Sequence, residues 1–281
     1  MKHRLCVILM ALVCLAGCAG EEKKGALAEN GLTPVNVASV TEEVKAVFRQ
    51  KTDEIEAEKR AEEERKKKNP RGNYLIAIDA GHQAQGNSEK EPIGPGAAEQ
   101  KAKVAGGTRG VSTGIPEYEL TLQVSLKLRD ALEEKGYQVL MIRETNDVNI
   151  SNAERAIVAN DAGANAFIRI HADGSESSSA AGMMTICQTP SNPYNGAIYQ
   201  QSRALADCIL NQAVATTGAA KRNVWETDTM SGINWAQVPT TILEMGFMTN
   251  PSEDQQMAEE EYQKKIVEGI VRGMDAFFGV E

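Results

Sequence analysis

Histidine and aromatic residues are scarce in this sequence of 281 residues. It contains three histidines, His3, His82 and His171, and only 5% aromatic residues, although 42% of the residues are hydrophobic, which suffices for a substantial core. Basic residues are not in excess either, because 30 Lys and Arg stand against 39 Asp and Glu, for a formal net charge of -9. This acidic balance argues against a nucleic-acid partner, since phosphate recognition requires a basic surface.

The N-terminal apolar run, Leu5 to Ala16, is too short to span a hydrocarbon core of about 30 Å. Lys2 and Arg4 precede it, as in an export signal. The run ends in Leu15-Ala16-Gly17-Cys18, which resembles the lipobox of bacterial lipoproteins. The sequence therefore predicts a lipoprotein signal peptide over residues 1–17, and a mature protein exported and lipid-anchored through Cys18 to a bacterial membrane, facing the cell wall. Ordinary signal cleavage beside an incidental cysteine is the alternative.

Few cysteines remain after such processing. Cys6 and Cys14 leave with the signal and Cys18 is modified, so Cys187 and Cys208 are left. Two thiols in an exported protein can pair. We favour two separately buried side chains, because nothing in the sequence brings these two positions together.

Residues 18–72 are predicted to form a tether and a charged linker. From Glu21 to Val40 the sequence has no periodicity, and Lys51 to Lys68 holds seven acidic and seven basic residues with almost no apolar ones. Such a segment cannot bury a face, which leaves a solvated single helix or a disordered spacer. Asn69-Pro70-Arg71-Gly72 ends any helix, so the folded domain is expected over residues 73–281.

The remaining chain alternates strand-like and helix-like segments, which predicts a single α/β domain with a mostly parallel mixed sheet flanked by helices. We expect strands near residues 75–80, 137–142, 166–170, 182–187 and 240–244, and helices near 117–135, 151–162, 197–217 and 260–278. Residues 83–116 interrupt this rhythm with 34 residues that include seven glycines. Insertions of this length in a compact domain are usually functional or disordered.

Two apolar runs end in histidine, at Leu75 to His82 and at Ala166 to Asp173. The carboxyl ends of strands in open α/β sheets are where ligands and metals collect. Two histidines make a poor zinc site, so a third protein ligand is expected. Glu117 is the candidate, because it precedes Leu120 and Val124 by three and seven residues and so points toward the sheet. The alternative for Glu117 is stabilisation of the helix N-terminus, worth ~0.3–1 kcal/mol.

Glu244 ends another predicted strand between apolar neighbours. A carboxylate in such surroundings is costly unless it is paired or has a chemical role. The structural alternative is a cap on the turn that follows, Met245-Gly246-Phe247.

Together these elements resemble the zinc-dependent N-acetylmuramoyl-L-alanine amidases over roughly residues 74–278. That family has an Asp-x-Gly-His start, a middle Glu, a Ser-Ile-His-Ala-Asn-like strand end and a Glu-x-Gly-Phe-x-x-Asn close. The chain carries them in the same order, as Asp79-Ala80-Gly81-His82, Glu117, Ile170-His171-Ala172-Asp173 and Glu244-Met245-Gly246-Phe247-Met248-Thr249-Asn250. One departure is Gln83-Ala84 in place of Gly-Gly, and another is the long 83–116 insertion.

The resemblance implies one zinc ion per chain, held by His82, Glu117 and His171, with Glu244 as the catalytic base. The substrate would be peptidoglycan, cleaved between the lactyl group of N-acetylmuramic acid and L-alanine of the stem peptide by water activated at the metal. A zinc peptidase or deacetylase would use the same residues. A non-catalytic wall-binding lipoprotein that used this fold as a docking surface would be expected to lack a ligand or the base, yet all four residues are present.

The sequence leaves two roles open for each of four further residues. Asp79 and Asp173 either orient the histidines or close turns at strand ends. Trp225 and Trp235 either stack on sugar or pack in the core. The insertion is expected to border the substrate groove and to tune access. Its cations are available to meet stem-peptide carboxylates: Lys90, Lys101, Lys103 and Arg109.

Overall fold

The computed structural model describes residues 37–280 of a chain that divides into two units, Met1–Glu58 and Lys59–Glu281. Helix α2 (Val37–Lys68) begins in the first unit and ends in the second. The charged segment is helical in the structure, and every described side chain from Glu42 to Lys68 is exposed. Cys18 and the lipobox lie outside the described residues. No helix within 37–280 is both long and apolar enough to cross a membrane.

The domain is built on a six-stranded mixed sheet of order β4-β1-β5-β8-β6-β7. Its strands are β4 (Gln138–Met141), β1 (Leu75–Ala80), β5 (Ala166–Asp173), β8 (Thr240–Phe247), β6 (Met183–Cys187) and β7 (Lys221–Glu226). Neighbours are parallel except β6 and β8, which run antiparallel, so the predicted mostly parallel sheet is confirmed. The strands predicted near 166–170 and 240–244 each extend three residues further, and β7 was not predicted because its sequence, Lys-Arg-Asn-Val-Trp-Glu, is largely polar.

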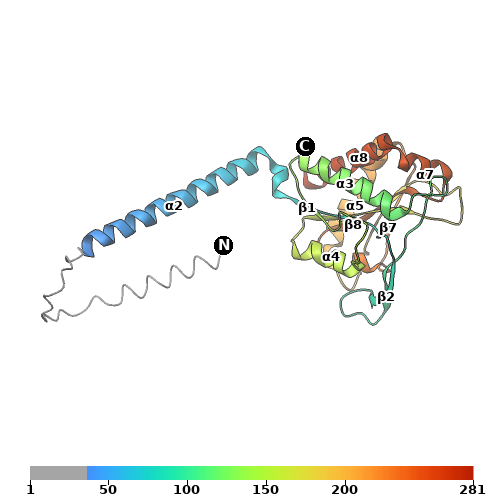
Figure 1. Ribbon diagram of the computed structural model, residues 1–281, viewed down its shortest axis with the longest axis horizontal. Helices are drawn as coiled ribbons and strands as arrows, with labels where there is room; N and C mark the ends of the chain where they lie inside the picture. The colour runs from blue at the N-terminus through green and yellow to red at the C-terminus, as the bar shows by residue number, and fades with distance from the viewer. Residues whose placement is uncertain (1–36, 281) are drawn as a thin grey trace. The chain divides into compact units, whose positions relative to one another are not determined.

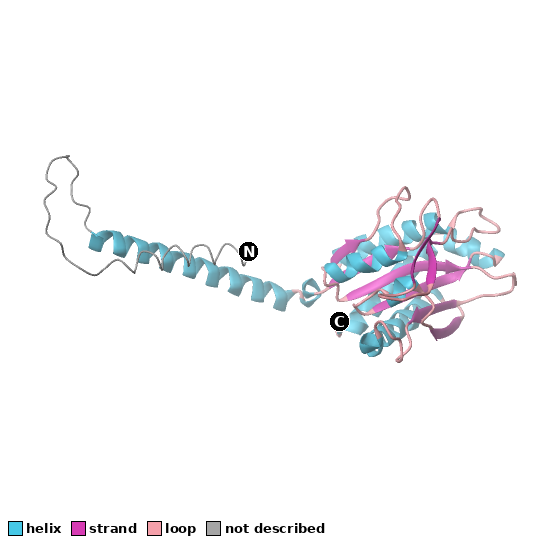
Figure 2. Ribbon diagram, turned by 90° about the horizontal axis from the view of Figure 1, so that it is seen from below, coloured by secondary structure: helices cyan, strands magenta, loops and turns pink. Residues whose placement is uncertain are grey.

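Helices cover both faces of this sheet (Figure 1). The strands, magenta in Figure 2, run between the two groups of helices. On one face, α3 (Glu117–Glu134), α5 (Tyr199–Thr217) and α8 (Glu260–Phe278) bury a large core against Ile76, Ile78 and Ile168. On the other face, α4 (Asn152–Asp161) packs on Ala77 and Phe167, and α6 (Ser231–Asn234) packs beside it. Shorter elements complete the domain: η1 (Pro70–Asn73), η2 (Gly196–Ile198) and α7 (Pro251–Ala258).

The 83–116 insertion contains an antiparallel hairpin of β2 (Asn87–Pro92) and β3 (Gln100–Val104), which the polar sequence did not predict. Hydrogen bonds with α4 and with the end of α6 hold it in place. Trp235 Nε1 donates to the Pro92 carbonyl (2.9 Å), Asn152 Nδ2 donates to the Lys103 carbonyl (2.9 Å), and the Ala153 N–H donates to the buried Glu91 carboxylate (3.2 Å). The hairpin is therefore a built part of the domain.

Candidate functional site

His82 follows β1 in a strained backbone conformation. Its φ of 62° makes it the sole non-glycine residue with positive φ between residues 37 and 280. Such strain persists where surrounding contacts fix it, and it concentrates at functional sites. The Nδ1 atom lies 2.9 Å from the Ala105 carbonyl, and Arg155 Nη2 donates to the His82 carbonyl (3.0 Å). Because a carbonyl only accepts, Nδ1 carries the proton and Nε2 is left to act as a ligand.

His171 lies near the carboxyl end of β5, against the turn that leads to His82. A Cβ atom on Gly81 would overlap the His171 imidazole, so glycine is required at that position. Burial lowers the pKa of His171 to about 4. The ring is therefore neutral at pH 7, as a metal ligand must be.

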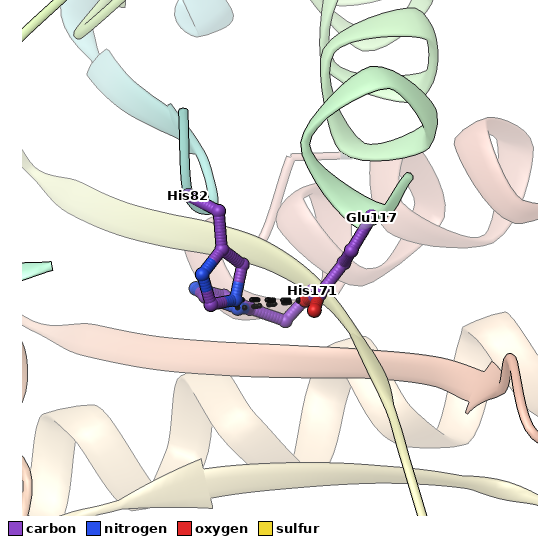
Figure 3. A group of neighbouring side chains, drawn as sticks. All are labelled: His82, Glu117 and His171. Atoms are coloured by element: carbon purple, nitrogen blue, oxygen red, sulfur yellow. Dashed lines mark hydrogen bonds and ion pairs between the residues drawn. The ribbon is translucent and has the colours of Figure 1, made fainter. Parts of the chain in front are cut away.

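Glu117 is the first residue of α3 and is buried. Its Oε1 lies 3.0 Å from His82 Nε2 and 3.2 Å from His171 Nδ1 (Figure 3). The Ala172 N–H donates to Oε1 (3.1 Å) and the Thr108 N–H to Oε2 (2.9 Å). Burial alone would raise the pKa of Glu117, but the hydrogen bond from His171, together with the one that His82 Nε2 donates when the ring is protonated, outweighs it and holds that pKa well below the ordinary value.

The structure thus brings together the three residues predicted as ligands. His82 Nε2, His171 Nδ1 and Glu117 Oε1 lie 3.0–3.2 Å from one another. Ligand atoms about 2.0–2.1 Å from a tetrahedral zinc ion would be about 3.3–3.4 Å apart. A small expansion of this cluster would therefore accommodate the ion. Two histidines and a glutamate are also an established donor set for catalytic zinc. Within the described residues, no other group of three such side chains converges in this way.

Glu244 of β8 is the register partner of His171 on β5, and both side chains line one cavity of about 360 Å³. The Glu244 Oε2 atom is buried, and no described residue donates a hydrogen bond to it. Burial, with the nearby charges of Glu117 and Asp173, raises the pKa of Glu244 well above the ordinary value. A buried carboxylate without a partner destabilises a fold, so its presence in this cavity indicates a chemical role.

The insertion borders this cavity, as predicted. Its β3 strand and the segment after it contribute lining residues: Lys101, Ala102, Val104 and Ala105. Of the four cations expected to meet substrate, Lys101 alone is among the lining residues. Lys103 pairs with Glu89 (2.8 Å), Arg109 donates to the Gly114 carbonyl (2.5 Å), and Lys90 is exposed.

Asp79 does not orient a histidine directly, which corrects one of its two predicted roles. Its fully buried carboxylate accepts hydrogen bonds from Arg155 Nη1 (2.6 Å) and Arg169 Nε (2.8 Å). Arg155 also donates to the carbonyls of Ala80 (3.1 Å) and His82, so Asp79 acts on the His82 turn through this arginine. Asp173 pairs with Arg222 (3.0 Å) and accepts from the Gly174 N–H.

Arg143 is a positioning residue that the sequence analysis did not identify. Its guanidinium donates to the carbonyls of Ala80 (2.7 Å) and Gly81 (3.0 Å), next to His82. It also donates to the Tyr118 carbonyl (2.8 Å) in the first turn of α3. Burial lowers the pKa of Arg143 to about 10, yet it stays charged at neutral pH and ties the two ligand-bearing segments together. Its position directly after a predicted strand was the available signal.

The cysteines and tryptophans lie apart from the site. Cys187 is buried in β6, Cys208 is half-buried in α5, and both are free, in agreement with separate burial. Trp225 is exposed on the edge strand β7, and the Trp235 ring packs against the core beneath α4. Neither indole is among the described residues that line the cavity.

Comparison with known proteins agrees with this geometry. The profile of the N-acetylmuramoyl-L-alanine amidase family matches residues 76–276. The N-acetylmuramoyl-L-alanine amidase Rv3717 of Mycobacterium tuberculosis is 27% identical over 213 residues, covering 74% of this chain and 87% of that protein. The uncharacterized protein YqiI of Bacillus subtilis is 33% identical over 168 residues, covering 60% and 77%. The crystal structure of the amidase Ami1 from Mycobacterium smegmatis superposes with a TM-score of 0.66 at 28% identity, covering 74% of this chain and 98% of that one.

Proposed function

This chain belongs to the N-acetylmuramoyl-L-alanine amidase family, and from this premise we propose its metal site and catalytic base. In this proposal His82, Glu117 and His171 bind one zinc ion, and Glu244 is the general base. The family match confirms the resemblance drawn from the motifs, and the chain is a peptidoglycan amidase. It hydrolyses the amide between the lactyl group of N-acetylmuramic acid and L-alanine of the stem peptide. The observation that carries the residue assignment is the buried, unpartnered Glu244 Oε2 in the same cavity as both histidines.

A zinc ion bound by the three ligands supplies Lewis-acid chemistry, by acidifying water and by polarising the scissile carbonyl. The chain's own residues then have distinct tasks. The Ala105 carbonyl keeps the His82 proton on Nδ1, and the N–H groups of Ala172 and Thr108 hold the Glu117 carboxylate in place. With only these three protein ligands, a bound zinc ion would still be able to take up water.

Glu244 is free to move a proton because none of its described neighbours donates to Oε2. In the proposed reaction this carboxylate takes a proton from the attacking water. It then returns the proton to the alanine nitrogen as the amide bond breaks. A positioned acid–base group of this kind contributes a factor of roughly 10² to 10⁴ in rate.

The anchoring of the protein is a further part of the proposal. Leu15-Ala16-Gly17-Cys18 supports cleavage before Cys18 and acylation of its thiol, with the mature protein outside the cell on a membrane. Residues 18–72, including the exposed helix α2, would then separate the domain from the lipid surface. In this arrangement the active site would have access to the cell wall.

Glu244→Gln tests the assignment most directly. The amide keeps the shape of the side chain but cannot accept a proton at this site, so we expect zinc content and folding to be retained while kcat falls about 10² to 10⁴-fold. Glu133→Gln, at an exposed position on α3, is the matched control and should behave as the parent. Near-normal turnover in Glu244→Gln would contradict the base assignment, whereas loss of zinc would make Glu244 a ligand.

Product analysis tests the bond that is cleaved. Purified muropeptides treated with the enzyme should yield new lactyl carboxylates and free alanine amino termini, and a chelator should stop their formation. New termini within the stem peptide would instead identify a zinc peptidase.

A further inference from the structure

The cavity beside the candidate metal centre is lined by more cationic side chains than carboxylates. Besides the two histidines, its lining includes the side chains of Arg169 and Lys101, whereas Glu244 is the sole carboxylate among its described lining residues. Lys101 Nζ donates to the Thr229 carbonyl (2.5 Å), a neutral acceptor, so its charge is not cancelled by that contact. An anionic group entering the cavity would meet both cations.

Arg169 is held rigidly by contacts on one side of its guanidinium. Nε donates to Asp79 (2.8 Å) and Nη2 donates to Asn152 Oδ1 (2.6 Å), and the residue is only 3% exposed. No described residue accepts from Nη1. This atom lies against Gly232 of α6, another residue of the cavity lining, where a Cβ would overlap it. The two N–H groups of Nη1 therefore have no acceptor among the described residues, in a side chain that belongs to the cavity lining.

The charge balance around Asp79 points the same way. This one carboxylate serves two arginines, Arg155 and Arg169, so one positive charge of the cluster is left over. The other donors of Arg155 bind the carbonyls of Ile150 and His82 and the side chain of Gln83. All the nitrogen atoms of the Arg155 guanidinium thus donate hydrogen bonds within the domain, whereas Arg169 keeps donors without an acceptor.

Arg169 precedes His171 by two residues on β5, so both side chains lie on the same face of the strand. A strand rises about 3.3 Å per residue, which places the two Cα atoms about 7 Å apart. That separation corresponds to about two residues of extended peptide. Arg169 is thus placed to contact a substrate group near the scissile amide and not the reacting carbonyl itself.

We propose that Arg169 and Lys101 form a specificity subsite for a carboxylate of the stem peptide close to the alanine. A guanidinium held by its Nε and Nη2 atoms presents its remaining N–H pair in a fixed orientation, which suits a carboxylate better than a neutral amide. The inference rests on the proposed function, because it assumes that the stem peptide lies across this cavity. It gives the enzyme a way to distinguish stems by charge.

The test uses two soluble muropeptides that are identical except that the residue after alanine carries a free carboxylate or its carboxamide. The zinc-loaded enzyme should show a kcat/KM roughly 10- to 100-fold higher for the carboxylate, the range expected for hydrogen bonds to a charged group. In Arg169→Gln this ratio should fall toward one, with the loss confined to the carboxylate substrate. A purely structural role would lower both values equally and leave the ratio unchanged.

Lys101→Met provides a second variant, which leaves the buried Asp79 cluster intact, and it should also lower the ratio. Lys103→Met on the same strand is the matched control, since Lys103 pairs with Glu89 and is not among the cavity-lining residues. Equal kcat/KM of the parent for both muropeptides would overturn the subsite, as would an unchanged ratio in both variants. If the parent cleaved neither, the proposed function would fail, and the subsite with it.

Discussion

Asp79 shows how single residues hold the site together from below. It is fully buried between Arg155 and Arg169, and through Arg155 it reaches the His82 turn. Removing one partner from a buried charge cluster leaves uncompensated charge in a low-dielectric interior. We expect Asp79→Asn to lower the free energy of unfolding by about 3–5 kcal/mol. Asp130→Asn, which removes an exposed partner of Arg129, should cost at most about 1 kcal/mol in the same urea titration.

The same residue predicts a pH dependence of stability. Burial alone would raise the pKa of Asp79, but the charges of Arg155 and Arg169 outweigh it and leave the pKa well below the ordinary value. A carboxyl with a depressed native pKa contributes stability above its unfolded pKa of about 3.9, and this contribution is lost as the pH falls below that value. Between about pH 5 and pH 2.5, the free energy of unfolding should therefore fall less steeply with decreasing pH in Asp79→Asn than in the parent. Identical slopes would contradict this sign.

His171→Ala is the corresponding prediction for the metal. It removes one of three converging ligand atoms, so zinc content and activity should be lost together while the sheet remains folded. Metal analysis of the purified domain with circular dichroism checks both parts. Full zinc occupancy in this variant would show that the ligand set is wrong.

The residues proposed to carry the chemistry were easier to single out from the sequence than those that position them. A histidine at the end of an apolar run carries a local signal, and so does a glutamate in a strand such as Glu244. Arg169 carries no such signal and Arg143 only its position after a strand, because the role of a buried arginine depends on partners that are distant in the sequence. Asp79 was noticed for the same local reason as His82, but its direct partners proved to be arginines.

Among the elements, the β2–β3 hairpin is the one that the sequence did not predict although it borders the cavity. It was missed as a pair of strands because Asn87–Pro92 has no apolar alternation, whereas the helices were predicted closely from their apolar periodicity. The hairpin obtains its stability from contacts with α4 and α6, which no local pattern encodes. Its ordered state could therefore not be derived from the sequence.

Trimming the hairpin tests its role. A Cβ on Gly86 would lie 3.2 Å from the Gly106 nitrogen, so the two ends of the hairpin meet and a short glycine linker can replace residues 87–104. Ala105 must stay, because its carbonyl holds His82. We expect zinc content to be retained and KM to rise, since one wall of the cavity is removed. Parent-like KM for every muropeptide would show that the hairpin does not contribute to binding.

At the scale of the whole molecule, the prediction concerns where the enzyme acts. Cys18→Ser removes the expected acylation site, so the protein should be released from membranes or remain unprocessed. Fractionation and the mass of the mature chain check this outcome. Cys208→Ser, a half-buried free cysteine in α5, is the matched control and should stay membrane-associated. Unchanged partitioning and a normal mature mass in Cys18→Ser would exclude the lipid anchor.

The spread of the site along the chain sets the order in which the enzyme becomes competent. The three ligand positions are complete once Ala166–Asp173 has joined the sheet, but Glu244 lies on a strand made more than sixty residues later. A chain emerging from its N-terminus would therefore contain the three proposed ligands before it contains the proposed base. In the proposed mechanism, hydrolysis therefore requires β8, the strand between β5 and β6, in addition to the segments that carry the three ligands.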